Sequence, residues 1–345
     1  MKKTALSVVV TMLATAGGTA QANESLNVSA YGGSWGDALQ ACIFTPFEEA
    51  TGIDVVVEPS ASSVTLSKLQ AEASSPIMDV AWMDGGVSEL ARDSGVVAPI
   101  DPSLAPGLAG VIDQAKYKTE GGGIYAVGNG YFAVGIVYNS EEITTPPTSW
   151  EDLWNAEYAG RVILPSAVNS IGVPIFAAFN ALAGGTLDDL TPGIEKMKTL
   201  EPALFFDSSG VANSGFQTGE GVIGAHYATQ AFTMADGGLP IAYAIPKEGA
   251  MASDIRIHIV KGTKNSEAAH KLVDFAVQPA QAGCLATRLQ VGPSTSGVEL
   301  PPEVAARMPW GADGSIDDLA VADWTAINAY RDALSEAWTR LASGN

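Results

Sequence analysis

Three polar or aromatic residues follow the ends of predicted strands, where side chains can bind a ligand. Ser34 and Trp35 come shortly after a strand predicted over 26–30, and Asp84 comes directly after a strand predicted over 78–83. In open α/β sheets, ligands bind beyond the carboxyl ends of the strands. A carboxylate there can pair with an ammonium group, and an indole ring can cover an apolar part of a ligand. For Trp35 the alternative is a place in the hydrophobic core.

A second set of candidates lies further along the chain and could bind the other part of a small charged solute. These residues are Ser208, Ser209, His226, Tyr227 and Arg256. The two serines could donate hydrogen bonds to an anion, or they form an ordinary turn. His226 and Tyr227 follow a predicted strand. The guanidinium of Arg256 suits a carboxylate or a phosphonate, or else it forms a salt bridge within the protein.

These residues give little support for an enzyme or for a resident metal. The three histidines lie in different segments without the spacing of metal ligands, and Cys-x-x-Cys is absent. His226 has no evident nucleophile partner in the sequence. Two cleft carboxylates could serve a secreted hydrolase that cleaves glycosides, but no spacing singles out such a pair. We therefore expect no catalysis, no metal and no cofactor, with a secreted hydrolase as the alternative.

The charge balance narrows the possible partners. The 345 residues include 38 Asp and Glu against 18 Lys and Arg, for a formal net charge of -20. Such a chain is repelled by nucleic acid and by anionic membrane surfaces. Because 47% of the residues are hydrophobic and 16% are charged, the composition is globular, and the length predicts two domains. We expect a monomer that binds no nucleic acid.

Residues 1–22 have the pattern of an export signal. Lys2 and Lys3 precede a stretch without charge that ends in Ala-Gln-Ala at Ala22. This is the small-x-small pattern that signal peptidase accepts. We expect cleavage after Ala22 and a periplasmic protein, and a retained membrane anchor is the alternative.

Strands and helices alternate along the mature chain, and they must position the candidate residues. Strands are predicted over 26–30, 53–57 and 78–83, and helices over 37–51, 64–73 and 87–94. This order is typical of an α/β fold with a largely parallel sheet. A second unit of the same kind follows an extended run over 125–138, and the segment 317–341 is strongly helical in pattern.

The chain has two cysteines, Cys42 and Cys284. In an oxidising compartment a pair of cysteines favours a disulfide over free thiols. Such a bridge requires the end of the chain to return to its beginning. The alternative is a pair of buried apolar thiols.

Segments spread over nearly the whole mature chain match one family in order. The chain resembles the periplasmic solute-binding proteins of ABC importers, in the group that includes the spermidine/putrescine-binding proteins (extracellular solute-binding family 1). The matching segments are Tyr31-Gly-Gly-Ser-Trp-Gly-Asp37 with Phe47-Glu-Glu-Ala-Thr-Gly-Ile53, Met78-Asp-Val-Ala-Trp82, Gly135-Ile-Val-Tyr-Asn139, Ser149-Trp-Glu-Asp-Leu-Trp154 with Tyr158-Ala-Gly-Arg-Val162, Ile245-Pro-Lys-Glu-Gly249, and Lys264-Asn-Ser-Glu-Ala-Ala-His270.

The resemblance implies a two-lobed, type II-like periplasmic binding protein fold with two crossover strands and C-terminal helices. Lobe 1 would comprise residues 23–130 and 255–305, and lobe 2 would comprise residues 131–254 and 306–345. The lobes would close on a small solute and deliver it to a permease in the inner membrane. This layout puts both cysteines in lobe 1, which favours the disulfide.

The resemblance also bears on the ligand. Tyr131 falls where the family often places an aromatic residue. The family's polyamine pattern has a Trp and, two residues on, an Asp, at positions occupied here by Ser253 and Ile255. Asp254 lies between them but would face the other side of a strand. Polyamine-like and amino-acid-like solutes both stay open, as do simpler carboxylates, and a ferric ion or an aminophosphonate is the alternative.

Overall fold

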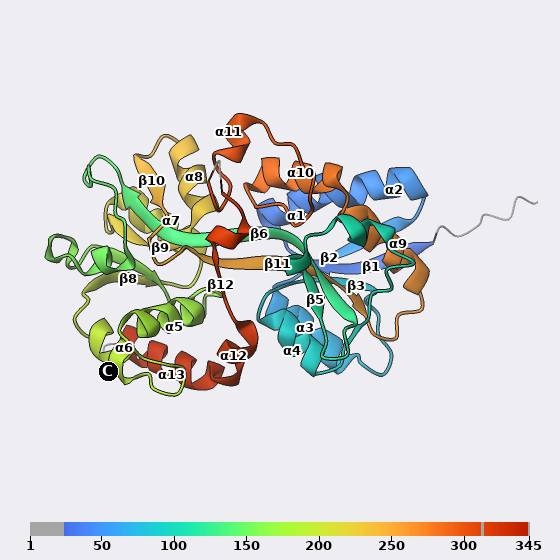
Figure 1. Ribbon diagram of the computed structural model, residues 1–345, viewed down its shortest axis with the longest axis horizontal. Coiled ribbons are helices and arrows are strands. Elements are labelled where there is room, and N and C mark those ends of the chain that lie inside the picture. Colours follow the sequence, from blue (N-terminus) through green and yellow to red (C-terminus); the bar gives the residue numbers. More distant parts are fainter. Residues whose placement is uncertain (1–23, 312–313, 344–345) are drawn as a thin grey trace, which may run out of the picture.

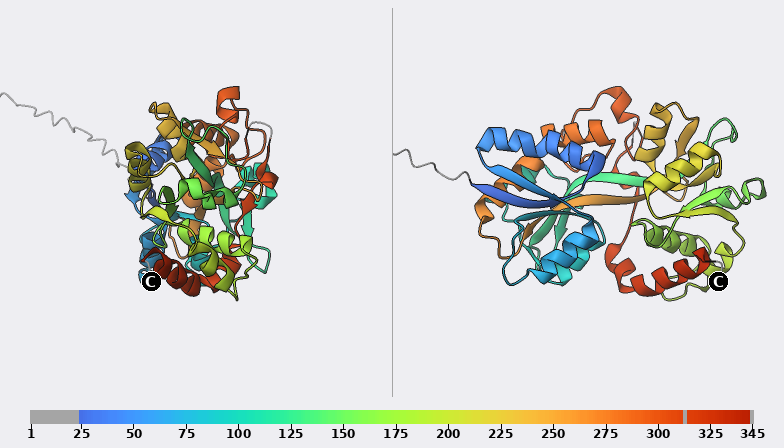
Figure 2. Two further views of the ribbon diagram at one scale, coloured as in Figure 1. Left: turned by 90° about the vertical axis from the view of Figure 1, so that its left-hand side faces the viewer. Right: turned by 180° about the vertical axis from the view of Figure 1, so that it is seen from behind.

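The computed structural model describes residues 24–311 and 314–343, so the expected signal peptide lies outside the described residues. The described chain forms one mixed sheet with the strand order β2-β1-β3-β11-β6-β9-β7-β8, and helices lie above and below it (Figures 1 and 2). The α/β fold class predicted from the sequence is confirmed. No helix in this part of the chain is long and apolar enough to cross a membrane.

The strands are short, apart from two long ones in the middle of the sheet. Their bounds are β1 Ser25–Ala30, β2 Asp54–Pro59, β3 Val80–Asp84, β4 Val97–Ala98, β5 Lys116–Lys118, β6 Ile124–Asn139, β7 Val162–Pro165, β8 Pro202–Phe206, β9 Ile223–Tyr227, β10 Ile241–Ala244, β11 Met251–Val260 and β12 Ala320–Val321.

The helices follow the strands in alternation. The α-helices are α1 Gly33–Leu39, α2 Thr45–Thr51, α3 Ser62–Ala71, α4 Val87–Asp93, α5 Gly172–Leu182, α6 Thr191–Met197, α7 Ser209–Thr218, α8 Ala228–Asp236, α9 Ser266–Ala276, α10 Pro279–Leu289, α11 Pro302–Ala305, α12 Trp324–Ala329 and α13 Arg331–Ala342. A π-helical segment, Gln40–Phe44, joins α1 to α2, and short 3-10 turns cover Pro106–Gly110, Asp113–Ala115, Trp150–Trp154, Ala156–Tyr158 and Ile316–Asp318.

The sheet has a parallel set of strands at each end. In lobe 1, β1 pairs in parallel with β2 and β3, and in lobe 2, β7 pairs in parallel with β8 and β9. Each strand leads into a helix, as in β1–α1, β3–α4 and β9–α8. Parallel strands present their carboxyl ends at one edge, so the turns that begin these helices gather beside one another.

Two antiparallel strands connect the lobes. β6 and β11 pair with each other, β11 pairs with β3 of lobe 1, and β6 pairs with β9 of lobe 2. Figure 1 shows both strands running through the middle of the molecule from one lobe to the other. The lobe boundaries expected at 130/131 and 254/255 fall inside these two strands.

The C-terminal segment contacts both lobes. α13 packs on α5 and α6 of lobe 2, where the Trp338 ring stacks on Phe176 with centroids 5.0 Å apart. α12 packs on α4 of lobe 1, and Asn328 Nδ2 donates a hydrogen bond to the carbonyl of Gly86 at 2.7 Å. Within the segment 317–341, which has a strongly helical pattern, Ala320 and Val321 instead form a strand beside β11.

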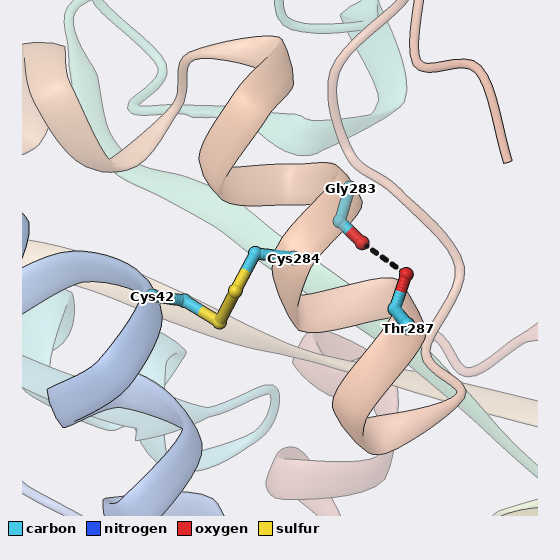
Figure 3. Close-up of a disulfide and its surroundings, with 4 residues drawn as sticks. All are labelled: Cys42, Gly283, Cys284 and Thr287. Atoms are coloured by element: carbon cyan, nitrogen blue, oxygen red, sulfur yellow. Dashed lines mark hydrogen bonds between the residues drawn. A yellow bond between two sulfur atoms is a disulfide. The ribbon is translucent and has the colours of Figure 1, made fainter.

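Cys42 and Cys284 form a disulfide, as the sequence indicated. Their Cα atoms are 5.7 Å apart although 242 positions separate them in the chain. Figure 3 shows the bridge between the helical segment after α1 and α10. The bridge therefore ties α10, a late helix of lobe 1, to the π-helical segment near the beginning of that lobe.

Candidate functional site

A cavity of about 340 Å³ lies between the lobes, at the carboxyl ends of β1, β3 and β9. This volume is within the range of small-molecule binding sites. One wall consists of the lobe 1 residues Tyr31, Gly32, Gly33, Ser34, Trp35 and Asp84 with Ile255 of β11, and the opposite wall consists of Phe132, Ser170, Ser209, Tyr227, Thr229 and Gln230. We call this cavity the cleft.

Asp84 is the one charged side chain among the residues that line the cleft. It ends β3, and its Oδ1 accepts a hydrogen bond from the hydroxyl of Tyr31 at 2.6 Å. Burial raises the pKa of Asp84, while hydrogen bonds from Tyr31 and Ser62 and the nearby positive charge of Arg256 act to lower this pKa. No hydrogen bond within the described chain uses Oδ2, so this oxygen remains free to bind a ligand group.

Aromatic rings surround this carboxylate. Tyr31 and Trp35 have ring centroids 6.1 Å apart on the lobe 1 side, and Phe132 meets Tyr227 edge to face at 5.6 Å on the other. Burial and the adjacent Asp84 raise the pKa of Tyr31, which therefore stays a hydrogen-bond donor at neutral pH. Rings around a carboxylate suit an ammonium group with an apolar chain.

The lobe 2 wall offers hydroxyl and amide groups instead of charges. Ser209 begins α7, and Thr229 and Gln230 lie in the first turn of α8, where backbone N–H groups lack helical partners. The hydroxyl of Tyr227 lies 3.0 Å from that of Ser170. This wall can donate several hydrogen bonds to an acceptor group.

The structure brings part of the predicted site together. Ser34, Trp35, Asp84, Ser209 and Tyr227 all line the cleft. The fold places them in one cavity because they lie at or shortly after the ends of β1, β3, β8 and β9.

Arg256 lies outside the cleft lining and is fully buried behind it. Its Nε donates to Asp254 at 2.9 Å and its Nη1 to Glu89 at 2.5 Å, and its guanidinium lies 3.4 Å from the centre of the Tyr117 ring. The arrangement corresponds to the salt-bridge alternative rather than to an exposed anchor for a ligand carboxylate. Alternation along β11 explains it, because Ile255 faces the cleft and both neighbours face away.

Tyr131 is also absent from the cleft lining. It is 1% exposed, and its hydroxyl has no hydrogen-bond partner among the described residues. The adjacent Phe132 lines the cleft instead. The aromatic position expected from the resemblance is therefore filled one residue later along β6.

Ser208 and His226 lie just behind the lobe 2 wall. Ser208 is the exposed residue before α7, and its carbonyl accepts the backbone N–H of Val211 and Ala212. His226 is fully buried, with Nε2 3.2 Å from Asn213 Oδ1. Burial lowers the pKa of His226 to about 3, so the imidazole is neutral at neutral pH.

Sequence reasoning missed several residues that line the cleft. These are Tyr31, Phe132, Ser170, Thr229, Gln230 and Ile255. Tyr31 directly follows β1 and could have been found from its position. Thr229 and Gln230 follow β9 in the same way, but uncharged residues at a helix start carry no distinctive signal.

The cleft shows neither a metal centre nor a nucleophile with a base. Within residues 24–311 and 314–343, no group of three or more His, Cys, Asp or Glu side chains could hold a metal ion. Gly32-Gly-Ser-Trp-Gly36 does match the Gly-x-Ser-x-Gly pattern of serine hydrolases. The histidines, however, bond elsewhere: His226 to Asn213, His258 to Ser88, and His270 to the backbone N–H of Asp101.

A two-lobed α/β fold with a polar and aromatic cleft between the lobes is the architecture of solute-binding proteins. Residues 43–309 match the family described as bacterial extracellular solute-binding proteins. The chain belongs to this family, and the resemblance noted from the sequence is confirmed.

Named relatives and solved structures agree with this membership. Spermidine/putrescine-binding periplasmic protein 1 of Haemophilus influenzae is 29% identical over 301 residues, which cover 83% of this chain and 81% of the relative. The gamma-aminobutyric acid-binding protein of Pseudomonas aeruginosa is 24% identical over 80% of this chain and 78% of its own length.

Solved structures show the same fold. An ABC transporter protein from Clostridium perfringens superposes with a TM-score of 0.79 and 22% identity, covering 92% of this chain and 99% of that one. The Atu4243-GABA receptor gives a TM-score of 0.78 at 21% identity, covering 93% and 98%.

Proposed function

We propose that this chain is the substrate-binding component of an ABC importer and that its ligand is a small solute with a single ammonium group. The protein is exported to the periplasm, loses residues 1–22, captures the solute in the cleft and delivers it to a permease. Closure of the lobes about β6 and β11 removes the solute from water.

The observation that carries the ligand assignment is the charge of the cleft lining, in which Asp84 is the one ionisable acid or base apart from tyrosine hydroxyls. A charged group taken out of water needs a partner of opposite charge. Asp84 can offset one ammonium group, and the surrounding rings can contact its carbon chain. A second ammonium group has no carboxylate in the lining.

The apolar residue Ile255 also disfavours a polyamine as the ligand. The resemblance assigns an Asp to this position in polyamine binders, and here the side chain that faces the cleft is apolar. Putrescine, which appears in the names of relatives, carries two ammonium groups, whereas gamma-aminobutyric acid carries one. The single carboxylate favours a solute of the second kind.

A thermal-shift screen of the purified mature protein tests the proposal. The screen compares monoamines, ω-amino acids, diamines, carboxylates, aminophosphonates and ferric citrate at equal concentration, because a ligand that binds the native state raises the unfolding midpoint. We expect the largest rise with compounds that carry one ammonium group. A rise only with diamines, or only with compounds that lack an amine, would overturn the ligand assignment.

A further inference from the structure

One amide side chain, that of Gln230, lines the lobe 2 wall, and its orientation decides what this wall offers to a ligand. An amide can present its NH2 group, which donates hydrogen bonds, or its oxygen, which accepts them. The hydrogen bonds behind the wall distinguish these two orientations.

Asn213 of α7 lies between Gln230 and His226. Its Nδ2 donates a hydrogen bond to Gln230 Oε1 at 2.8 Å, and its Oδ1 lies 3.2 Å from His226 Nε2. A carbonyl oxygen accepts only, so His226 must carry its proton on Nε2 in this arrangement. The direction of donation then runs from His226 to Asn213 and from Asn213 to Gln230.

The reverse direction would be less favourable. If both amides were turned round, Asn213 would donate to His226 Nε2, and the imidazole proton would move to Nδ1. That atom is buried and has no hydrogen-bond partner among the described residues. A buried N–H without an acceptor is rarer in proteins than an acceptor without a donor. The observed direction leaves only a lone pair unpaired at Nδ1.

The histidine cannot easily change this direction by taking up a second proton. His226 is fully buried against the ring of Phe206, with centroids 4.9 Å apart. Burial lowers its pKa to about 3. The imidazole is therefore neutral over the pH range in which a periplasmic protein works.

We propose that His226 and Asn213 are positioning residues that hold the NH2 group of Gln230 toward the cleft, so that lobe 2 selects a ligand end that accepts hydrogen bonds. Ser209 and Thr229 can add donors from the same wall. The inference rests on the proposed function, in which Asp84 binds an ammonium group at the other wall. Together the two walls fit a zwitterion with an ammonium group and a carboxylate at opposite ends.

The test compares two probes that differ at one end. Putrescine and gamma-aminobutyrate each have four carbon atoms and an ammonium group at one end. The other end is a second ammonium group in putrescine and a carboxylate in gamma-aminobutyrate. Calorimetric titration gives the two Kd values for each variant. For the unmodified protein we expect gamma-aminobutyrate to bind at least about tenfold more tightly, a difference of about 1.4 kcal/mol.

The hydrogen bonds from His226 to Asn213 and from Asn213 to Gln230 form what we call the relay. Asn213→Asp reverses the direction of donation in its second hydrogen bond, between residue 213 and Gln230. One carboxylate oxygen accepts the His226 proton, and the other requires a donor, so Gln230 turns its NH2 group inward and its oxygen toward the cleft. We expect the preference for gamma-aminobutyrate to fall at least about tenfold. Ser214→Asp is the matched control, because it adds the same charge at the next, exposed position of α7 and should leave the preference unchanged.

A second variant and distinct outcomes separate the inference from the proposed function. Asn213→Leu removes the relay without adding charge, so it should reduce the preference in the same direction even if Asn213→Asp fails to fold. If the Asn213 variants prefer gamma-aminobutyrate over putrescine as strongly as Ser214→Asp does, the inference about His226 and Asn213 is wrong. The proposed ammonium site at Asp84 is unaffected by that result. If the unmodified protein binds neither probe, or if Asp84→Asn binds gamma-aminobutyrate as tightly, the proposed function fails and the inference fails with it.

Discussion

The hydroxyl of Tyr31 lies 2.6 Å from Oδ1 of Asp84 and donates a hydrogen bond to it across the carboxyl ends of two parallel strands. Tyr31 follows β1 and Asp84 ends β3, 53 positions further along the chain. Asp84 lines the cleft, and no hydrogen bond within the described chain uses its other oxygen, Oδ2. The hydrogen bond from Tyr31 orients the carboxylate and helps to keep it ionised before a ligand arrives.

The Tyr31–Asp84 pair predicts how amine binding depends on pH. Burial raises the pKa of Asp84, and the hydrogen bond from Tyr31 acts against this rise. Affinity for an amine should fall as the pH drops through this pKa, by up to about tenfold per pH unit. In Tyr31→Phe the pKa rises further, so the fall should begin at a higher pH.

Titration of Tyr31→Phe with gamma-aminobutyrate over a series of pH values checks this expectation. Tyr158→Phe is the control, because Tyr158 lies in lobe 2 outside the cleft lining. A Tyr31→Phe profile with an unchanged midpoint would show that the hydroxyl does not act on Asp84.

The ionised carboxylate of Asp84 should lower the stability of the ligand-free protein at neutral pH. Because the pKa of Asp84 is higher in the folded state, the folded chain binds more protons than the unfolded chain between the ordinary value and the raised one. Stability should therefore fall as the pH rises through this window. Asp84→Asn should unfold at a higher temperature than the unmodified protein at neutral pH, as thermal unfolding without ligand can measure. A lower midpoint for the variant would contradict this account.

The disulfide should stabilise lobe 1 without affecting ligand choice. Cys42 and Cys284 close a loop of 242 positions, and both lie outside the cleft lining. Replacing both with alanine should lower the free energy of unfolding by about 2–5 kcal/mol in urea titrations. The Kd for gamma-aminobutyrate should change by less than about twofold. A selective loss of binding with unchanged stability would assign the bridge to the site instead.

Arg256 should act as a structural residue rather than as a ligand anchor. Its removal leaves Asp254 and Glu89 buried without their cation, so Arg256→Met should destabilise the protein by about 3–5 kcal/mol. Arg161→Met, which breaks the more exposed ion pair with Glu142, should cost less than about 1 kcal/mol. Urea unfolding of the two variants and of the unmodified protein measures both changes in the free energy of unfolding.

Ligand measurements on Arg256→Met separate its two possible roles. The ratio of the Kd values for gamma-aminobutyrate and butylamine should match that of the unmodified protein, provided that the variant is folded at the assay temperature. A loss confined to gamma-aminobutyrate would restore Arg256 as the partner of a ligand carboxylate.

The sequence was sufficient for the lobe 1 elements that carry the cleft. The strand–helix order, the end of the helix predicted over 37–51 and the ends of β1 and β3 followed from local pattern, and Asp84 followed from its place after a predicted strand. Gly52 has φ of 72°, a conformation that glycine adopts without strain, so its role as a helix stop could be predicted.

The orientation of side chains on the crossover strands was harder to predict. Gly130 has φ of 148°, and the pairing of β6 with β11 shifts register between Ile255 and Arg256. Such an irregularity hides which of Tyr131 and Phe132 faces the cleft. For Arg256 a signal did exist, because alternation from Ile255 turns it away together with Asp254.

Two segments also differed from the pattern. An ordinary turn was the alternative for Ser208 and Ser209, yet Ser209 begins α7, whose Gly and Ser content gives weak helix propensity. Packing on β8 and α8 stabilises this helix. Ala320 and Val321, in the segment with a helical pattern over 317–341, form a strand for the opposite reason. They pair with β11, a strand partner that local propensity does not reveal.

The most direct test of the account is a calorimetric titration of gamma-aminobutyrate into the mature protein and into Asp84→Asn. Asp54→Asn, at an exposed position of β2, serves as the control for the lost charge. We predict that Asp84→Asn weakens binding by about 2–4 kcal/mol, roughly 30- to 1,000-fold, and that Asp54→Asn leaves it unchanged. Equal affinity in all three proteins would contradict the assignment of Asp84 as the ammonium partner.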